Sequence, residues 1–174
     1  MAIELKKLNR KVILKRGLDL VLIGAMIYAA LMAFGVVRRG GRFEEGRVAP
    51  DFTVHSLSDG KEVKLSDYKG KPVLLNFFST DCPSCRRELP HVADIQEEAG
   101  DKLQVLVIST DAPTKLKSYL KNEDIELSAA YDRGVAHQAY GVDTIPYLVV
   151  IDSEGKIRGD YVGMVKYSDV EPYL

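Results

Sequence analysis

The only two cysteines of the chain lie close together, in the motif Cys82-Pro83-Ser84-Cys85. The motif follows a nearly apolar run, residues 72–78, and opens a segment with helical periodicity. A spacing of three residues places both sulfurs on one helix face, close enough for a disulfide. The helix N-terminus carries unpaired N–H groups and a positive partial charge, which favour a thiolate. We predict that Cys82 is the attacking nucleophile and Cys85 the resolving thiol.

The residues around the pair suit the same chemistry. Pro83 fits the first turn of a helix, where its missing N–H would be unpaired anyway. Ser84 adds a small polar group that leaves the sulfurs open to a substrate. Glu88 lies one turn beyond Cys85, so a partly buried carboxyl there could exchange a proton with that thiol. The alternative for Glu88 is a solvated carboxylate on the helix surface.

A proline precedes a later apolar run, residues 147–151. An X–Pro bond can be cis at modest cost, and proline is tolerated where a strand begins. We predict that Pro146 forms a cis-proline loop beside the cysteines, with Thr144 and Ile145 binding substrate and the Ile145 backbone pairing with an incoming peptide. The alternative is an ordinary proline at a strand entry.

Two other functions could use the same cysteines. A Cu(I) metallochaperone would bind copper through both thiolates, with His137 recruited as a third ligand. A peroxidase would need a proline in the stretch FFSTDC, which has none. A zinc site would need a second pair of cysteines, and the three histidines have no ligand spacing. We expect no resident metal and no cofactor.

Apolar runs and helical periodicity alternate along the rest of the chain. Strands are expected over 52–57, 62–65, 72–78, 103–109, 127–131, 147–151 and 156–162. Helices are expected from the cysteines to about Glu98, over 113–122 and 135–140, and from Ser168 onward. This alternation predicts a mixed α/β sheet with helices on both faces and an antiparallel hairpin at its end.

Charge and hydropathy separate the N-terminal part from the rest. Of the 24 Lys and Arg residues and 25 Asp and Glu residues, residues 1–42 hold nine and two, leaving fifteen and twenty-three for 43–174. The two net charges are therefore +7 and −8, and they sum to −1. A balance near zero argues against a nucleic-acid binder, and 46% hydrophobic residues indicate a globular protein.

Residues 20–37 carry no charge, and residues 17–37 would span about 30 Å as a helix. We predict a basic tail over 1–16, a transmembrane helix over 17–37 that contacts the lipid bilayer, a linker over 38–46 and a catalytic domain over 47–174. A cleaved signal peptide is the alternative, but no A-x-A site follows. Six basic residues before the helix and four after it favour an extracytoplasmic domain.

Residues 47–165 resemble the thioredoxin superfamily, in its membrane-anchored TlpA/ResA-like branch of thiol-disulfide oxidoreductases. The matching stretches are APDF, LSDYKGKPVLLNFF, CPSCRRELP, GVDTIP and VVIDSEGKI. The resemblance implies a thioredoxin-like fold with an N-terminal hairpin and an inserted strand–helix unit. It also implies that Glu88 is the branch's active-site glutamate and Pro146 its cis-proline.

The branch commonly reduces disulfides of extracytoplasmic proteins, including cysteines of apocytochromes c before haem attachment. The resemblance therefore implies a reductant that receives electrons from a membrane thiol relay. Asp81 stands where the branch usually has tryptophan, and a carboxylate there would raise the pKa of the Cys82 thiol. Asn76 stands where thioredoxin has a buried aspartate. CP-x-C after Phe-Phe-Ser also resembles the anchored oxidoreductase of methylamine-dehydrogenase maturation, which leaves the substrate open.

Overall fold

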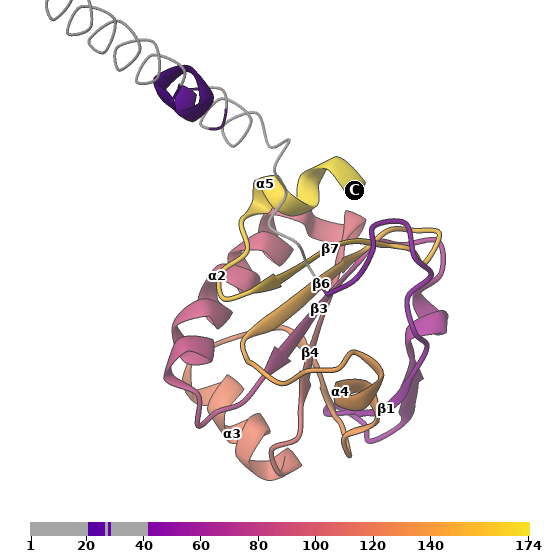
Figure 1. Ribbon diagram of the computed structural model, residues 1–174. Coiled ribbons are helices and arrows are strands. Elements are labelled where there is room, and N and C mark those ends of the chain that lie inside the picture. Colours follow the sequence, from indigo (N-terminus) through magenta and orange to yellow (C-terminus); the bar gives the residue numbers. More distant parts are fainter. Residues whose placement is uncertain (1–20, 27, 29–41) are drawn as a thin grey trace, which may run out of the picture. The chain divides into compact units, whose positions relative to one another are not determined.

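The computed structural model describes residues 21–26, 28 and 42–174 (Figure 1). The chain divides into two units, residues 1–40 and 41–174, and the described residues of the first unit are helical. The predicted tail over 1–16, and most of the predicted transmembrane segment 17–37, lie outside the described residues. Within the described ranges, no helix has both the length and the apolar character needed to cross a membrane.

The second unit is built on one seven-stranded sheet, in the order β2-β1-β5-β4-β3-β6-β7. Strands β3, β4 and β5 are parallel, whereas β6 and β7 at one side and β1 and β2 at the other pair antiparallel. The strands are β1 Thr53–Ser56, β2 Glu62–Lys64, β3 Val73–Phe78, β4 Gln104–Ser109, β5 Ser128–Tyr131, β6 Tyr147–Ile151 and β7 Ile157–Val162.

Helices cover both faces of this sheet (Figure 1). Successive side chains of a strand point to opposite faces, so the apolar strand β3 serves two cores. Leu74 and Phe78 pack with the helices α2 and α3, and Phe77 packs in the other core, which includes α4. The helices are α2 Pro83–Ala99, α3 Pro113–Asn122, α4 Val135–Ala139 and α5 Tyr167–Val170, with 3-10 turns at Leu65–Tyr68, Gly100–Lys102 and Glu171–Tyr173.

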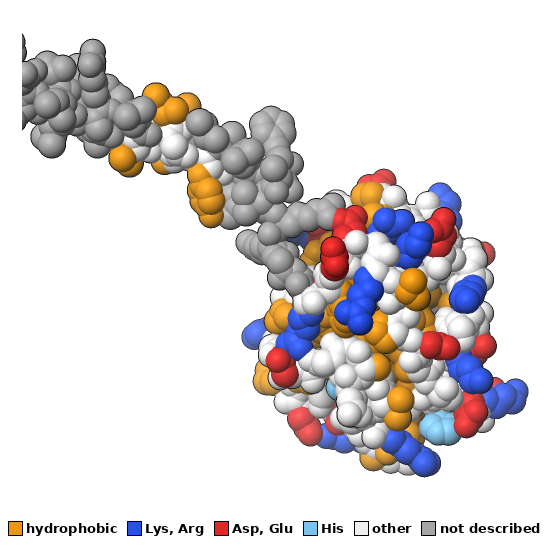
Figure 2. Space-filling model, turned by 45° about the vertical axis from the view of Figure 1, so that its right-hand side comes forward, with side chains coloured by type: hydrophobic (Ala, Val, Ile, Leu, Met, Phe, Trp, Pro, Cys, Tyr) orange, Lys and Arg blue, Asp and Glu red, His pale blue; other side chains and the backbone are white. Residues whose placement is uncertain are grey.

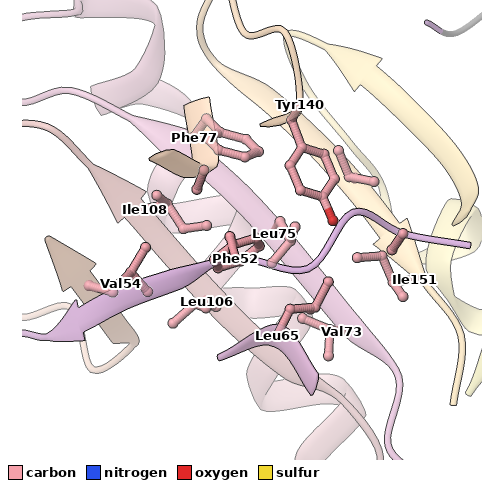
Figure 3. Close-up of a cluster of buried hydrophobic side chains, with 14 of the residues drawn as sticks. Phe52, Val54, Leu65, Val73, Leu75, Phe77, Leu106, Ile108, Tyr140 and Ile151 are labelled. Carbon is pink, nitrogen blue, oxygen red and sulfur yellow. The ribbon is translucent and has the colours of Figure 1, made fainter. Parts of the chain in front are cut away.

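In the core on the α4 face, residues from the beginning of the domain pack against the sheet (Figure 3). Phe52 and Phe77 both place their rings against Tyr140, at centroid distances of 5.8 and 5.6 Å. The Tyr140 hydroxyl donates a hydrogen bond to the Pro50 carbonyl oxygen at 3.0 Å. Burial raises the pKa of Tyr140 well above its usual range, so this donor keeps its proton.

The surface of this unit mixes the two signs of charge. Figure 2 shows basic and acidic side chains interspersed on the face in view, with hydrophobic side chains between them. The net charge of −8 in residues 43–174 is therefore not gathered into one acidic patch on that face.

The structure confirms the predicted mixed sheet with helices on both faces, and the N-terminal and C-terminal hairpins. The last helix begins at Tyr167 rather than Ser168. Two strand–helix pairs, β4–α3 and β5–α4, lie between α2 and Pro146, in keeping with the insertion that the resemblance implies. Strand β3 ends at Phe78 and α2 begins at Pro83, so the cysteine motif lies at the carboxyl end of the central strands, where α/β sheets place their sites.

Candidate active site

The two cysteines form a disulfide at the N-terminus of α2, with 5.3 Å between their Cα atoms. Cys82 is the N-cap residue, and its Sγ accepts a hydrogen bond from the Cys85 backbone N–H at 3.2 Å. Cys82 is half-buried, whereas Cys85 is 0% exposed and packs with Phe78 and Leu89. One sulfur can therefore meet a partner from solution, and the other is shielded behind it.

The two residues between the cysteines are exposed. Pro83 is the first residue of α2, as predicted, and Pro at this position leaves no N–H unpaired. The Ser84 hydroxyl oxygen lies 3.2 Å from the Cys82 Sγ. Because a disulfide sulfur carries no proton, Ser84 is the donor in this contact.

The loop before β6 approaches the half-buried sulfur from the other side. The Ile145–Pro146 peptide bond is cis, and Pro146 is buried. The carbonyl oxygen of Ile145 lies 3.8 Å from the Cys82 Sγ. Thr144 is exposed and hydrogen-bonds to its neighbour Asp143. The structure thus brings the predicted loop to the cysteines through Ile145, while Thr144 faces solvent beside it.

Glu88 is buried, and its side chain is bound to the strand beneath α2. It is 1% exposed, and its Oε2 accepts a hydrogen bond from the Asn76 Nδ2 at 2.8 Å. Burial raises the pKa of Glu88 to about 7, and the Asn76 hydrogen bond opposes that rise. The solvated alternative for Glu88 is therefore wrong. A carboxyl with this pKa can take up or release a proton near neutral pH.

Asn76 is a site residue that the sequence indicates only as a difference from thioredoxin, which has a buried aspartate at this position. It lies in the middle of β3, on the same face as Phe78 and toward α2. Among the described residues, its Oδ1 and the Glu88 Oε1 have no hydrogen-bond partner although both atoms are buried. A single polar residue inside the apolar run of 72–78 was the available signal, but spacing alone did not show which side chain it meets.

The loop before Cys82 is attached to the segment that joins β4 and α3. Asp111 accepts hydrogen bonds from the Thr80 backbone N–H at 2.6 Å and from the hydroxyls of Ser79 and Ser109 at 3.3 and 3.1 Å. Burial opposes ionisation of Asp111, but the Thr80 and Ser109 hydrogen bonds and the Lys115 charge keep its pKa below the usual value. Lys115 also bonds to the Asp81 Oδ2 at 2.6 Å.

The Pro146 loop is attached to Arg42, the first described residue of the second unit. The Arg42 guanidinium donates to the Gly141 carbonyl and to the Asp143 carboxylate, and it lies 5.4 Å from the centre of the Tyr147 ring. The Arg42 backbone N–H donates to Asp160 on β7 at 2.7 Å. No motif in the sequence indicates these contacts, because they join residues about one hundred positions apart.

Within residues 42–174, no hydrogen bond, ion pair or ring contact joins His137 to either cysteine. Its Nδ1 lies 2.7 Å from the Oδ2 of the buried Asp132, and its ring packs edge-on against Phe77. In the described part of the chain, no three His, Cys, Asp or Glu residues form a group that could hold a metal ion. The histidine is held by an acidic partner on the α4 side of the sheet.

Comparison with known proteins points to one family. Residues 46–159 match the model of the AhpC/TSA family. The chain is 30% identical over 158 residues to the thiol-disulfide oxidoreductase ResA of Bacillus thuringiensis subsp. konkukian (strain 97-27), covering 89% of this chain and 90% of that protein. It is 33% identical over 135 residues to the thioredoxin-like protein YneN of Bacillus subtilis (strain 168), covering 75% and 79%.

A solved structure agrees with these sequence matches. The exposed lipoprotein thioredoxin Etrx1 of Streptococcus pneumoniae strain TIGR4 superposes with a TM-score of 0.61 at 32% identity, covering 71% of this chain and 96% of that one. The fold, the adjacent cysteine pair and the extent of the matches lead to one assignment. The chain belongs to the AhpC/TSA family, among its thioredoxin-fold thiol-disulfide oxidoreductases of the ResA kind.

Proposed function

We propose that the protein is a membrane-anchored reductant of disulfides in extracytoplasmic proteins, acting through Cys82 and Cys85. The observation that carries this proposal is the unequal exposure of the two sulfurs. Cys82 is half-buried at the N-terminus of α2, next to the exposed Ser84 and the Ile145 carbonyl, whereas Cys85 is fully buried. A thiol–disulfide exchange needs one sulfur that a large partner can reach and a second sulfur held close behind it.

The exchange begins with the reduced dithiol. The Cys82 thiolate attacks one sulfur of the substrate disulfide, which forms a mixed disulfide and releases the first substrate thiolate. The Cys85 thiolate then attacks the Cys82 Sγ, which releases the second substrate thiolate and forms the Cys82–Cys85 bond. Two electrons pass from this dithiol to the substrate. A membrane dithiol donor returns the pair to its reduced form.

Glu88 accepts the proton that Cys85 must lose before it can attack. The two residues are one turn apart on the buried face of α2. A pKa of about 7 lets Glu88 hold or give up a proton near neutral pH. Asn76 positions the carboxyl through its 2.8 Å hydrogen bond.

The backbone of Ile145 provides the contact for the incoming peptide. Pro83, Ser84 and Thr144 are exposed around the half-buried sulfur and would line the bound substrate. The substrate class that we propose is a protein with a solvent-accessible disulfide, such as the cysteine pair of an apocytochrome c before haem attachment. The ResA-like resemblance supports this class.

The location rests on the sequence. A transmembrane helix over 17–37, after a basic tail over 1–16, would hold the domain of residues 47–174 outside the cytoplasm, with 38–46 as the linker. The description of the pneumococcal relative as an exposed lipoprotein agrees with an extracytoplasmic setting for that protein. Protease accessibility of the tagged domain in intact cells and in spheroplasts tests this arrangement.

The decisive experiment is substrate trapping with the full-length protein in its own membrane. We expect Cys85→Ser to accumulate a mixed disulfide with a partner protein through Cys82, because the resolving thiol is missing. Cys82→Ser should trap no partner and should lose all exchange activity. The mutant Ser118→Ala, at an exposed serine on α3, is the matched control and should behave as wild type. Failure of Cys85→Ser to trap any protein would contradict the proposal.

The reduction potential fixes the direction of exchange. A value near or below about −250 mV, titrated against dithiothreitol, supports a reductant, and a value of about −120 to −180 mV indicates an oxidant or isomerase. Two further assays cover the alternatives. Tight Cu(I) binding without disulfide turnover would replace the proposal by a metallochaperone, and rapid peroxide consumption by a peroxidase.

A further inference from the structure

The residue before the proposed nucleophile is an acid. Asp81 directly precedes Cys82, and its side chain is 78% exposed. A negative charge beside a cysteine disfavours the thiolate and works against the partial positive charge of the helix N-terminus. Unless this charge is compensated, Cys82 would be a weaker nucleophile than its place at the start of α2 suggests.

A lysine from another element pairs with that acid. The Nζ of Lys115, in the first turns of α3, lies 2.6 Å from the Asp81 Oδ2 and 3.9 Å from the Asp111 Oδ1. The pKa of Lys115 is raised, chiefly by its hydrogen bond to Asp81, so the ammonium group stays charged at neutral pH. Lys115 thus supplies a positive charge to the acid that precedes the cysteine.

Hydrogen bonds to Asp111 hold the loop that carries Asp81 next to the start of α3. Asp111 is 11% exposed at its side chain and holds the loop before α2 through the Thr80 N–H and the Ser79 hydroxyl. Asp111 and Lys115 are four residues apart at the start of α3. The same partly buried carboxylate therefore fixes the loop that carries Asp81 and lies beside the lysine that pairs with Asp81.

We propose that Lys115 is a positioning residue for disulfide exchange: it holds and neutralises Asp81, and so keeps Cys82 reactive although an acid precedes it. This inference rests on the proposed role of Cys82. In residues 83–88, at the start of α2, the other charged side chains are Arg86, Arg87 and Glu88; α3 also carries Lys117 and Lys121, and Asp143 lies before β6. Of these, Arg86 lies over the Tyr119 ring, Glu88 bonds to Asn76 and Asp143 to Arg42.

The test measures the reactivity of Cys82 against pH. Full-length protein with Cys85→Ser, solubilised in detergent and reduced, reports Cys82 alone when its alkylation by iodoacetamide is followed. We expect Lys115→Met to raise the midpoint of the pH profile by about half a unit, which corresponds to roughly threefold slower alkylation below the midpoint. Lys117→Met, at another exposed lysine of α3, is the control and should leave the midpoint unchanged.

A second substitution identifies the route of the effect. Asp81→Asn should lower the midpoint, and in that background Lys115→Met should have a smaller effect, because the ammonium group is no longer held beside the residue that precedes Cys82. An unmoved midpoint in Lys115→Met would overturn the inference. So would an effect of the same size in the Asp81→Asn background, because Lys115 would then act on Cys82 directly. Disulfide exchange by the wild-type protein, measured in parallel, tests the proposed function separately.

Discussion

Two carboxylates near the disulfide have opposite surroundings. Glu88 lies inside α2 at 1% exposure, with the neutral amide of Asn76 as its partner. Asp81 lies before α2 at 78% exposure, with the ammonium group of Lys115 as its partner. The buried acid faces a neutral donor, and the exposed acid faces a full opposite charge.

The two surroundings suit the two roles that we propose: Glu88 exchanges a proton, and Lys115 compensates the charge of Asp81. Burial penalises the ionised form, and one neutral hydrogen bond does not offset the penalty, so Glu88 has a pKa of about 7. An exposed ion pair is screened by water and contributes little to stability, but it can still set the local charge. We therefore expect substitutions on the buried side to change stability and its pH dependence, and those on the exposed side to change reactivity.

The largest effect is expected for Glu88→Gln. The folded-state pKa of Glu88 is raised from 4.5 to about 7, so its contribution to stability is fully present below about pH 4.5 and is lost as pH rises through about 7. Over that window the wild-type protein should lose about 3 kcal/mol of unfolding free energy relative to the glutamine variant. Urea unfolding of both oxidised proteins at pH 4.5, 6 and 8 measures this difference. Parallel stability curves would mean that Glu88 is not a titrating buried acid.

A smaller effect is expected for Asn76→Ala. Loss of the amide leaves the Glu88 carboxylate without its hydrogen bond, so the unfolding free energy at pH 8 should fall by about 2 kcal/mol. The loss should be smaller at pH 5, where Glu88 is already protonated. Asn122→Ala, at an exposed position that ends α3, is the control. An equal loss at both pH values would show that the amide contributes through packing alone.

Arg42→Ala tests a side chain whose exposure lies between that of Glu88 and that of Asp81. The Arg42 side chain is 33% exposed and joins the Pro146 loop through Gly141 and Asp143. We expect a fall in melting temperature of about 2 °C and faster hydrogen exchange in residues 141–145. Arg47→Ala, which removes an exposed guanidinium lying over Phe43, should leave exchange in that loop unchanged. Unchanged exchange in Arg42→Ala would show that the loop is held by its other contacts.

The smallest change in stability is expected for Asp81→Asn. Its ion pair with Lys115 is solvent-exposed, so the melting temperature should shift by less than about 1 °C. Differential scanning calorimetry at low and high salt measures this shift. A large, salt-independent loss would place Asp81 among the structural residues and end the contrast with Glu88.

The sequence predicted the elements better than the contacts between them. The nearly apolar run of 72–78 and the glycine at 100 bounded β3 and α2 closely, because burial and helix termination are local properties. The burial of Glu88 and the cis state of Pro146 were left open, since both depend on the packed fold. The partners Asn76, Lys115 and Arg42 were missed, because periodicity identifies a face but not the side chain opposite it.

The shielding of Cys85 sets an order of events. A reagent too large to pass Cys82 can open the disulfide only by attacking the half-buried sulfur, so every turnover starts and ends at the same atom. In the mechanism that we propose, a protein partner therefore forms its mixed disulfide with Cys82 and not with the buried Cys85. Any covalent adduct with another protein that is recovered from cells should therefore be attached through Cys82 alone.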